Sequence, residues 1–153
     1  MPASPALAEL ARQLLGSLPA GVLSTHSLHA PGYPFGSMTP FAADEKQRPL
    51  FLFSGLAEHT HNVLADPRAG LCLMESTSGE QQAAARVTYL GDVTPVPPEE
   101  AATAQAAYVA RHPQAKMWSS FGDFRMFRME VQRIYVVAGF GRMGWIRPEQ
   151  AQP

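Results

Sequence analysis

The feature of this sequence that most restricts its fold is the order of its apolar segments. The segments are short, turn-forming residues separate them, and helical patterns are inserted only at irregular intervals. A parallel sheet needs a crossover after each strand, and this chain lacks that regular alternation. The pattern therefore favours an α+β fold, in which about six antiparallel strands close into a small barrel with helices outside.

The strand-like segments alternate apolar and polar residues or form short apolar runs between turn signals. They cover Gly21–His29, Ser37–Ala43, Leu50–Phe53, Ala69–Glu75, Arg86–Val96, and finally Phe124–Met129 and Val131–Ala138, which can also be one long bent strand. The first three are expected to form a meander, because the polar stretch Asp44–Pro49 suits a hairpin connection. Gly91, inside the fifth segment, indicates a β-bulge.

Helical patterns occupy four places between and before these strands. Ser4–Leu18 repeats leucine and alanine at i, i+3 and i+4 spacing, which predicts an amphipathic helix. His59–Asp66 predicts a short helix that Pro67 stops. Pro97–Arg111 starts with prolines and glutamates, which suit the positive end of a helix. Gln114–Ser120 suits a further helical turn.

Composition limits the class of protein. The chain has 153 residues, a formal net charge of −1, 46% apolar residues and one cysteine. This length suits a single domain over residues 1–153. The charge argues against a nucleic-acid partner, and a lone cysteine excludes an intramolecular disulfide. A surface with few charges favours a buried subunit interface.

The beginning of the chain suggests its location. Met1 to Ala20 has no basic segment followed by a continuous apolar run, and no apolar run in the chain approaches the length of a membrane span. We therefore expect a cytoplasmic protein with no membrane partner.

The run Gly139-Phe-Gly-Arg-Met-Gly144 has the spacing of a dinucleotide-binding fingerprint. That fingerprint works only where a helix opens after the glycines and a second strand follows. Nine residues follow Gly144, and Pro148 is among them. We expect no helix or strand there, so a glycine-rich terminal turn is the preferred interpretation.

The tripeptide His59-Thr60-His61 can be interpreted in three ways. Two histidines two positions apart on a helix point in different directions, and no cysteine is near, so a metal site is disfavoured and no metal is expected. A helix start that faces an anion fits better, because Thr60, Asn62 and backbone N–H groups are donors. A surface helix with incidental histidines fits equally well.

Other chemistry has little support in the sequence. Cys72 stands between Leu71 and Leu73 in a predicted strand, which favours a thiol buried in the core. No G-x-S-x-G elbow occurs, and no pair of carboxylates stands out. Phe121, Phe124 and Phe127 recur every three residues, a spacing that favours core packing over a ligand lid.

Six short motifs occur in an order that resembles a known family. They are GYPFGSMTPF at 32–41, PLFLFSGLAEHTHN at 49–62, ADPRAGL at 65–71, RVTYLG at 86–91, FGDF at 121–124 and GFGR at 139–142. Together they resemble the pyridoxamine 5′-phosphate oxidase-like FMN-binding split-barrel family, and most of all its haem-utilisation-like branch. The resemblance extends from about Leu7 to Trp145.

The resemblance implies a split β-barrel homodimer with FMN at the subunit interface. In such proteins one strand lies along the flavin ring, and a second segment holds the ribityl and phosphate groups. The matching cofactor-binding residues here are Gly36, Ser37, Met38, Thr39, Phe53, Ser54, Gly55, His59, Thr60, His61 and Asn62. It implies an FMN-dependent oxidoreductase of unknown small-molecule substrate, and the sequence identifies no catalytic residue.

One departure from the family keeps two alternatives open. Relatives usually carry arginine where this chain has His61, and imidazole is a weaker partner for phosphate than guanidinium. Arg68 or Arg86 could compensate. The first alternative is a haem-binding or haem-degrading protein on the same fold. The second is a flavin-free binding module that has kept the barrel.

Overall fold

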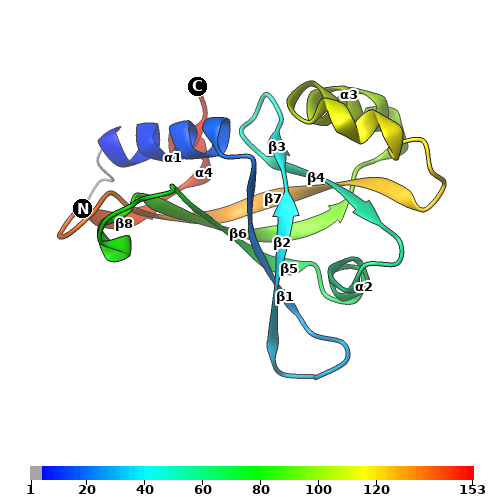
Figure 1. Cartoon of the computed structure of the whole chain (residues 1–153), viewed down its shortest axis with the longest axis horizontal. Helices are drawn as coiled ribbons and strands as arrows, with labels where there is room; N and C mark the ends of the chain where they lie inside the picture. The colour runs from blue at the N-terminus through cyan, green and yellow to red at the C-terminus, as the bar shows by residue number, and fades with distance from the viewer. Residues whose placement is uncertain (1–4) are drawn as a thin grey trace.

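The computed structural model describes residues 5–153, and Figure 1 shows their arrangement. Ser4, the expected first residue of the first helix, lies outside this range. The helices are α1 (Pro5–Ser17), α2 (Glu58–Ala65), α3 (Pro98–Arg111) and α4 (Pro148–Ala151), with 3₁₀ turns η1 (Gln81–Ala83) and η2 (Pro113–Met117). Within the described residues, no helix has the length and apolar character needed to cross a membrane.

All strands belong to one antiparallel sheet. They are β1 (Ala20–His26), β2 (Pro34–Pro40), β3 (Ala42–Ala43), β4 (Pro49–Ser54), β5 (Arg68–Met74), β6 (Arg86–Pro95), β7 (Phe124–Val137) and β8 (Met143–Ile146). The order across the sheet is β2-β1-β5-β6-β7-β4-β3. The long strand β7 pairs with β6, and it also pairs with β4 near its start and with β8 near its end.

The sheet curls because its two edge strands are neighbours in the sequence. β2 ends at Pro40 and β3 begins at Ala42, so Phe41 alone joins the opposite ends of the strand order. Phe41 is fully buried. Its carbonyl oxygen accepts a hydrogen bond from His112 Nε2 at 2.7 Å, and the Arg111 guanidinium lies 5.1 Å from its ring centre.

Two helices cover different parts of the sheet (Figure 1). The apolar face of α1 packs into the main core, where Tyr89 donates a hydrogen bond to the Ala11 carbonyl at 3.2 Å. Helix α3 packs on β3, β4 and the start of β7, and Ala104 and Tyr108 contribute to a second, smaller apolar cluster there. The helices therefore stabilise the curl from two directions.

The expected α+β antiparallel split barrel is confirmed, and residues 5–153 form eight strands in place of the expected six. The expected strand Ser37–Ala43 breaks at Phe41 into β2 and β3. The two expected strands after residue 124 are one continuous strand, β7. The expected bulge at Gly91 is present as a register shift between Leu90 and Gly91.

The end of the described chain differs from expectation, since β8 and the one-turn helix α4 occupy the residues after the glycine-rich run. Gly139 and Gly141 have φ of 124° and 73°, which glycine adopts readily, and they reverse the chain within a few residues. The reversed segment pairs directly with β7, so four residues suffice for a strand. A strand, not a dinucleotide-facing helix, therefore follows this turn.

Cys72 is not in the core, and this expectation is wrong. Leu71 and Leu73 are fully buried, so the strand alternation turns Cys72 to the outer face. There it belongs to a row of directly paired residues that crosses six strands, which we call the outer row. Its members are Met38, Val22, Cys72, Thr88, Tyr135 and Trp145.

We expect Gly91→Ala to lower the free energy of unfolding by about 2–3 kcal/mol, because the added Cβ overlaps the Glu130 carbonyl and meets Met129 Cγ at 2.9 Å. Gly16→Ala is the matched control, since a Cβ there meets nothing within 4 Å. Because Gly16 lies in helix α1, this change should raise the free energy of unfolding by at most about 1 kcal/mol. Urea unfolding measures both, and equal effects of the two variants would contradict the packing role of Gly91.

Candidate functional site

The expected cofactor residues lie on β2 and on the turn from β4 into α2, and the fold brings only some of them together. Ser37 Oγ lies 3.3 Å from His59 Nδ1, which joins the two segments. Phe53 packs against the His59 ring, with ring centres 4.4 Å apart. Gly36 and Met38 are exposed, and the strand alternation places them on the other face of β2 from Ser37. The side chain of Thr39 is buried.

His59 has the environment of a neutral imidazole. It is partly buried beside Phe53, and this burial lowers the pKa of the ring from its ordinary value of 6.5. The neutral form of the ring is therefore favoured at pH 7. When Nδ1–H donates to Ser37 Oγ, Nε2 presents a lone pair, which is the form in which histidine binds metals.

Arg125 also borders this cluster, and sequence reasoning missed it. Phe53 and Arg125 are direct cross-strand partners, and the guanidinium lies 5.4 Å from the Phe127 ring centre. The Phe53 and Phe127 rings are 5.0 Å apart. The sequence did contain one indication of this contact. Arg125 stands two positions before Phe127, and residues two apart in a strand lie on the same face. We call Ser37, Phe53, His59 and Arg125 the β2–α2 site.

The start of α2 does not direct its polar side chains outward. Thr60 is buried and donates from Oγ1 to the Ser54 carbonyl at 2.7 Å. Asn62 is fully buried, donates from Nδ2 to Thr25 Oγ1 at 3.0 Å, and accepts the Leu28 N–H at 3.0 Å. Both side chains therefore hold the helix in place.

Acidic groups also lie at this helix start. Asp123 accepts hydrogen bonds from Ser54 Oγ at 2.9 Å and, through its carbonyl, from the Gly55 N–H at 2.6 Å. Glu58 is in the first helical turn. Carboxylates at a helix N-terminus compete with a bound phosphate for its positive end. This arrangement does not favour a phosphate at the first turn of α2.

The remaining basic residues of the expectation lie elsewhere. His61 is exposed, and its Nε2 donates to the Gly55 carbonyl at 2.8 Å. Arg68 pairs with Asp66, beyond the other end of α2. Arg86 donates to backbone carbonyls of the η1 segment. Neither arginine therefore takes the place of the one that relatives carry at position 61.

His59 and His61 do not share a direction. One ring contacts Ser37 and Phe53, and the other contacts the Gly55 carbonyl. Within residues 5–153 no group of three or more histidine, cysteine, aspartate or glutamate side chains is placed to hold a metal ion. The tripeptide therefore offers one inward imidazole, not a chelating pair.

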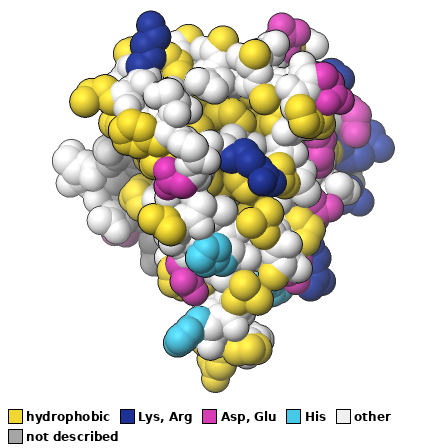
Figure 2. All heavy atoms as spheres, turned by 90° about the vertical axis from the view of Figure 1, so that its right-hand side faces the viewer, with side chains coloured by type: hydrophobic (Ala, Val, Ile, Leu, Met, Phe, Trp, Pro, Cys, Tyr) yellow, Lys and Arg dark blue, Asp and Glu magenta, His cyan; other side chains and the backbone are white. Residues whose placement is uncertain are grey.

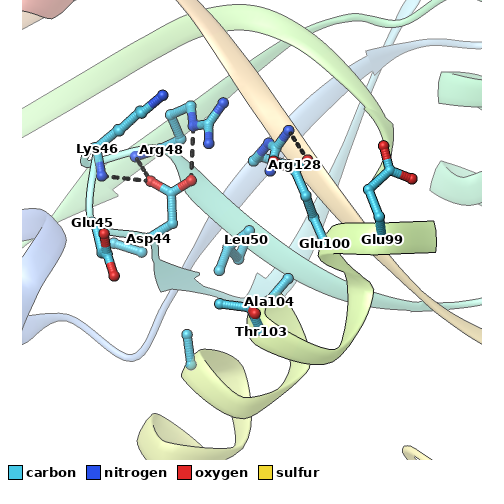
Figure 3. A pocket seen from close by; sticks show the side chains of 12 residues that line it. Asp44, Glu45, Lys46, Arg48, Leu50, Glu99, Glu100, Thr103, Ala104 and Arg128 are labelled. Atoms are coloured by element: carbon cyan, nitrogen blue, oxygen red, sulfur yellow. Dashed lines mark hydrogen bonds and ion pairs between the residues drawn. The ribbon is translucent and has the colours of Figure 1, made fainter. Parts of the chain in front are cut away.

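Two hollows lie outside the β2–α2 site. One, of about 490 Å³, is on the outer face of β1, β5 and β6 and has His26 and Arg68 in its lining. The other, of about 430 Å³, lies between the β3–β4 hairpin and α3 (Figure 3). In that cleft Arg48 pairs with Asp44 at 2.7 Å, and Arg128 pairs with Glu100 at 3.0 Å. The first pair lies within the hairpin and the second joins β7 to α3, while Arg48 also pairs with Glu130 of β7 at 2.9 Å. Both arginines are therefore occupied.

The face that contains α2 and the loop before β7 is rich in apolar side chains (Figure 2). A basic side chain lies in a hollow among yellow hydrophobic ones, and a histidine lies below it. Leu56 is 83% exposed and Phe121 is 56% exposed. Both are next to the Ser54–Asp123 hydrogen bond, so this apolar surface adjoins the β2–α2 site.

Comparisons with known proteins match the chain to one family and to several individual proteins. The family described as "CREG, beta-barrel" matches residues 2–151. The chain is 38% identical over 131 residues to the chloroplastic non-canonical haem oxygenase HOZ of Arabidopsis thaliana, covering 86% of this chain and 40% of that protein. A solved structure titled as a heme binding protein from Mycobacterium smegmatis is 30% identical with a TM-score of 0.87, covering 99% of this chain and 61% of that chain.

A more distant structure relates the fold to the expected family. A Clostridium acetobutylicum protein, described as belonging to the pyridoxinephosphate oxidase family, has a TM-score of 0.72 at 8% identity, covering 97% of this chain and 99% of that chain. At this identity the likeness shows the fold alone. The chain spans about two fifths of the plant relative's length and about three fifths of the mycobacterial chain.

We expect Asn62→Ala to cost about 2–3 kcal/mol of stability, because it leaves the Leu28 N–H and the Thr25 hydroxyl without their buried partner. His61→Ala, two positions away and exposed, should cost less than about 1 kcal/mol. Urea midpoints of the two purified variants measure the difference. A stable Asn62→Ala protein would contradict the structural role of this side chain.

Proposed function

The chain belongs to the CREG β-barrel family and has the split-barrel fold of pyridoxamine 5′-phosphate oxidase-like proteins, and from this premise we propose that it binds haem at the β2–α2 site. The observation that carries the proposal is His59, a partly buried imidazole held between Ser37 and the Phe53 ring, whose burial lowers its pKa. Ser37 orients this ring through Nδ1, and Nε2 is the nitrogen available to an iron.

The residues of the β2–α2 site fit haem in kind. An imidazole can ligate the iron, and Arg125 is a cation on the strand paired with that of Phe53, the residue that packs against this imidazole. Bound haem would supply an iron centre that binds small ligands or transfers electrons. The chain's own contribution would be to orient the imidazole and exclude water from one side of the ring.

Haem fits this chain better than the FMN that the sequence resemblance implied. The two relatives at 30% identity or more reported above are named for haem oxygenase activity and haem binding. FMN requires a phosphate site at the start of α2, where Glu58 and Asp123 contribute negative charge and Thr60 is turned inward. An FMN-dependent oxidoreductase and a cofactor-free binding module are the rival hypotheses.

We also propose that the protein is a homodimer, as the resemblance implied, and that the outer row lies in the interface. Three members of the row, Met38, Val22 and Trp145, are 70%, 42% and 56% exposed. No member of the row is charged. An uncharged, largely apolar row across six strands is the kind of surface that a second subunit covers.

We expect the purified protein to bind added haem with a saturable shift of the Soret band. His59→Ala should abolish this shift or weaken binding by more than the roughly tenfold loss expected for Ser37→Ala, which removes only the orienting partner. His26→Ala, at an exposed position on β1, is the matched control and should bind as the unsubstituted protein does. FMN added in the same way should leave no bound flavin after gel filtration.

Three outcomes would count against the haem proposal. Unchanged haem binding by His59→Ala would exclude this residue as the ligand. Retention of FMN, with no spectral change on adding haem, would restore the flavoprotein hypothesis. A protein that binds neither would favour the binding module.

We expect Val22→Asp to convert a dimer into a monomer, because it puts a charge in the middle of the outer row. Leu64→Asp is the control, since Leu64 is 54% exposed on α2, outside the outer row. Light scattering after gel filtration gives the mass of each protein. A monomeric unsubstituted protein, or a dimeric Val22→Asp variant, would contradict the proposed interface.

A further inference from the structure

Arg125 has an unusual environment among the arginines of the sheet. Its guanidinium makes a cation–π contact with Phe127, and within residues 5–153 it has no carboxylate or carbonyl partner. By contrast, Arg48 and Arg128 each bind two acidic groups. The donors of Arg125 are therefore available to something outside the described chain.

The position of Arg125 is fixed more firmly than that of an ordinary surface arginine. Its backbone is paired with Phe53 within the β4–β7 ladder. Its head group lies over the Phe127 ring, which is buried in the core. Contact with an aromatic face restricts the guanidinium without occupying its N–H donors. A guanidinium whose position is already restricted loses less conformational entropy on binding a planar anion than a mobile one does.

The carboxylate closest in sequence is already engaged. Asp123 accepts a hydrogen bond from Ser54 Oγ, and its backbone carbonyl accepts the Gly55 N–H. These contacts hold Asp123 to the β4–α2 turn. Arg125 therefore forms no ion pair with Asp123, and its N–H donors stay available beside Phe53.

We infer that Arg125 binds a carboxylate of the ligand, so that the β2–α2 site selects planar ring systems carrying carboxylate side chains. The inference rests on the proposed haem binding and adds the group that recognises the edge of the ring. His59 would contact the centre of such a ligand, and Arg125 would contact an acidic substituent at its rim. A guanidinium group can form a bidentate pair of hydrogen bonds with a carboxylate.

The apolar surface beside the site agrees with a ligand of this kind. Leu56 and Phe121 are large, exposed and adjacent to the β4–α2 turn. A ligand with one carboxylate edge and one hydrocarbon edge can bind Arg125 and these side chains together. A small inorganic anion would leave the apolar side chains uncovered.

The test compares haem with haem dimethyl ester, in which both carboxylates are neutralised, on three proteins. These are the unsubstituted protein, Arg125→Gln and Arg133→Gln, an exposed arginine farther along the same strand. We expect Arg125→Gln to weaken haem binding about 10- to 100-fold, the loss typical of a charge-assisted pair. It should leave ester binding within about twofold. Arg133→Gln should change neither affinity.

A conservative variant and a second ligand sharpen the result. Arg125→Lys should recover part of the lost haem affinity, because it restores the charge without the two-bonded geometry. Equal haem affinity in Arg125→Gln and the unsubstituted protein would overturn the inference while haem binding itself stands. If no protein binds haem and only Arg125→Gln loses FMN, the arginine anchors a phosphate, and both proposals are wrong.

Discussion

The structure depends on one short connection, Phe41, which joins β2 to β3 at opposite ends of the strand order. A sheet whose edges are one residue apart in sequence has to curl until they meet. Burial of the Phe41 ring, its contact with Arg111 and the hydrogen bond from His112 stabilise this point. The curl in turn brings β2 close to α2, so that Ser37 contacts His59.

Buried polar groups need hydrogen-bond partners within the protein, and this need determines which residues near α2 remain available to a ligand. By residue type, Thr60 and Asn62 are the best hydrogen-bond donors at the helix start. Both side chains, however, form hydrogen bonds that fix α2 against its neighbouring segments. A buried amide or hydroxyl without a partner is costly, so such groups rarely stay free for ligands. His59 and Arg125 lie at the boundary of the core, where an aromatic contact supplies packing without using polar atoms.

Much of the fold could be read from the sequence, because strand alternation and turn chemistry are local. The six main strands, the three longer helices and the Gly91 bulge follow from such patterns. The predictions that failed concern features that depend on tertiary structure. Cys72 was assigned to the core from its apolar neighbours, although alternation turns it outward. The strand β8 was missed because its four residues form a strand only by pairing with β7.

By itself, the sequence determined the antiparallel α+β architecture and the family resemblance, since both depend on the order of short motifs along the chain. It also identified Ser37, Phe53 and His59 as candidate residues. Only the tertiary structure decided which candidates face a common space, because strand register and the orientation of α2 set the side-chain directions. It added Arg125, which is distant from His59 in sequence and comes next to Phe53 only through the pairing of β4 with β7.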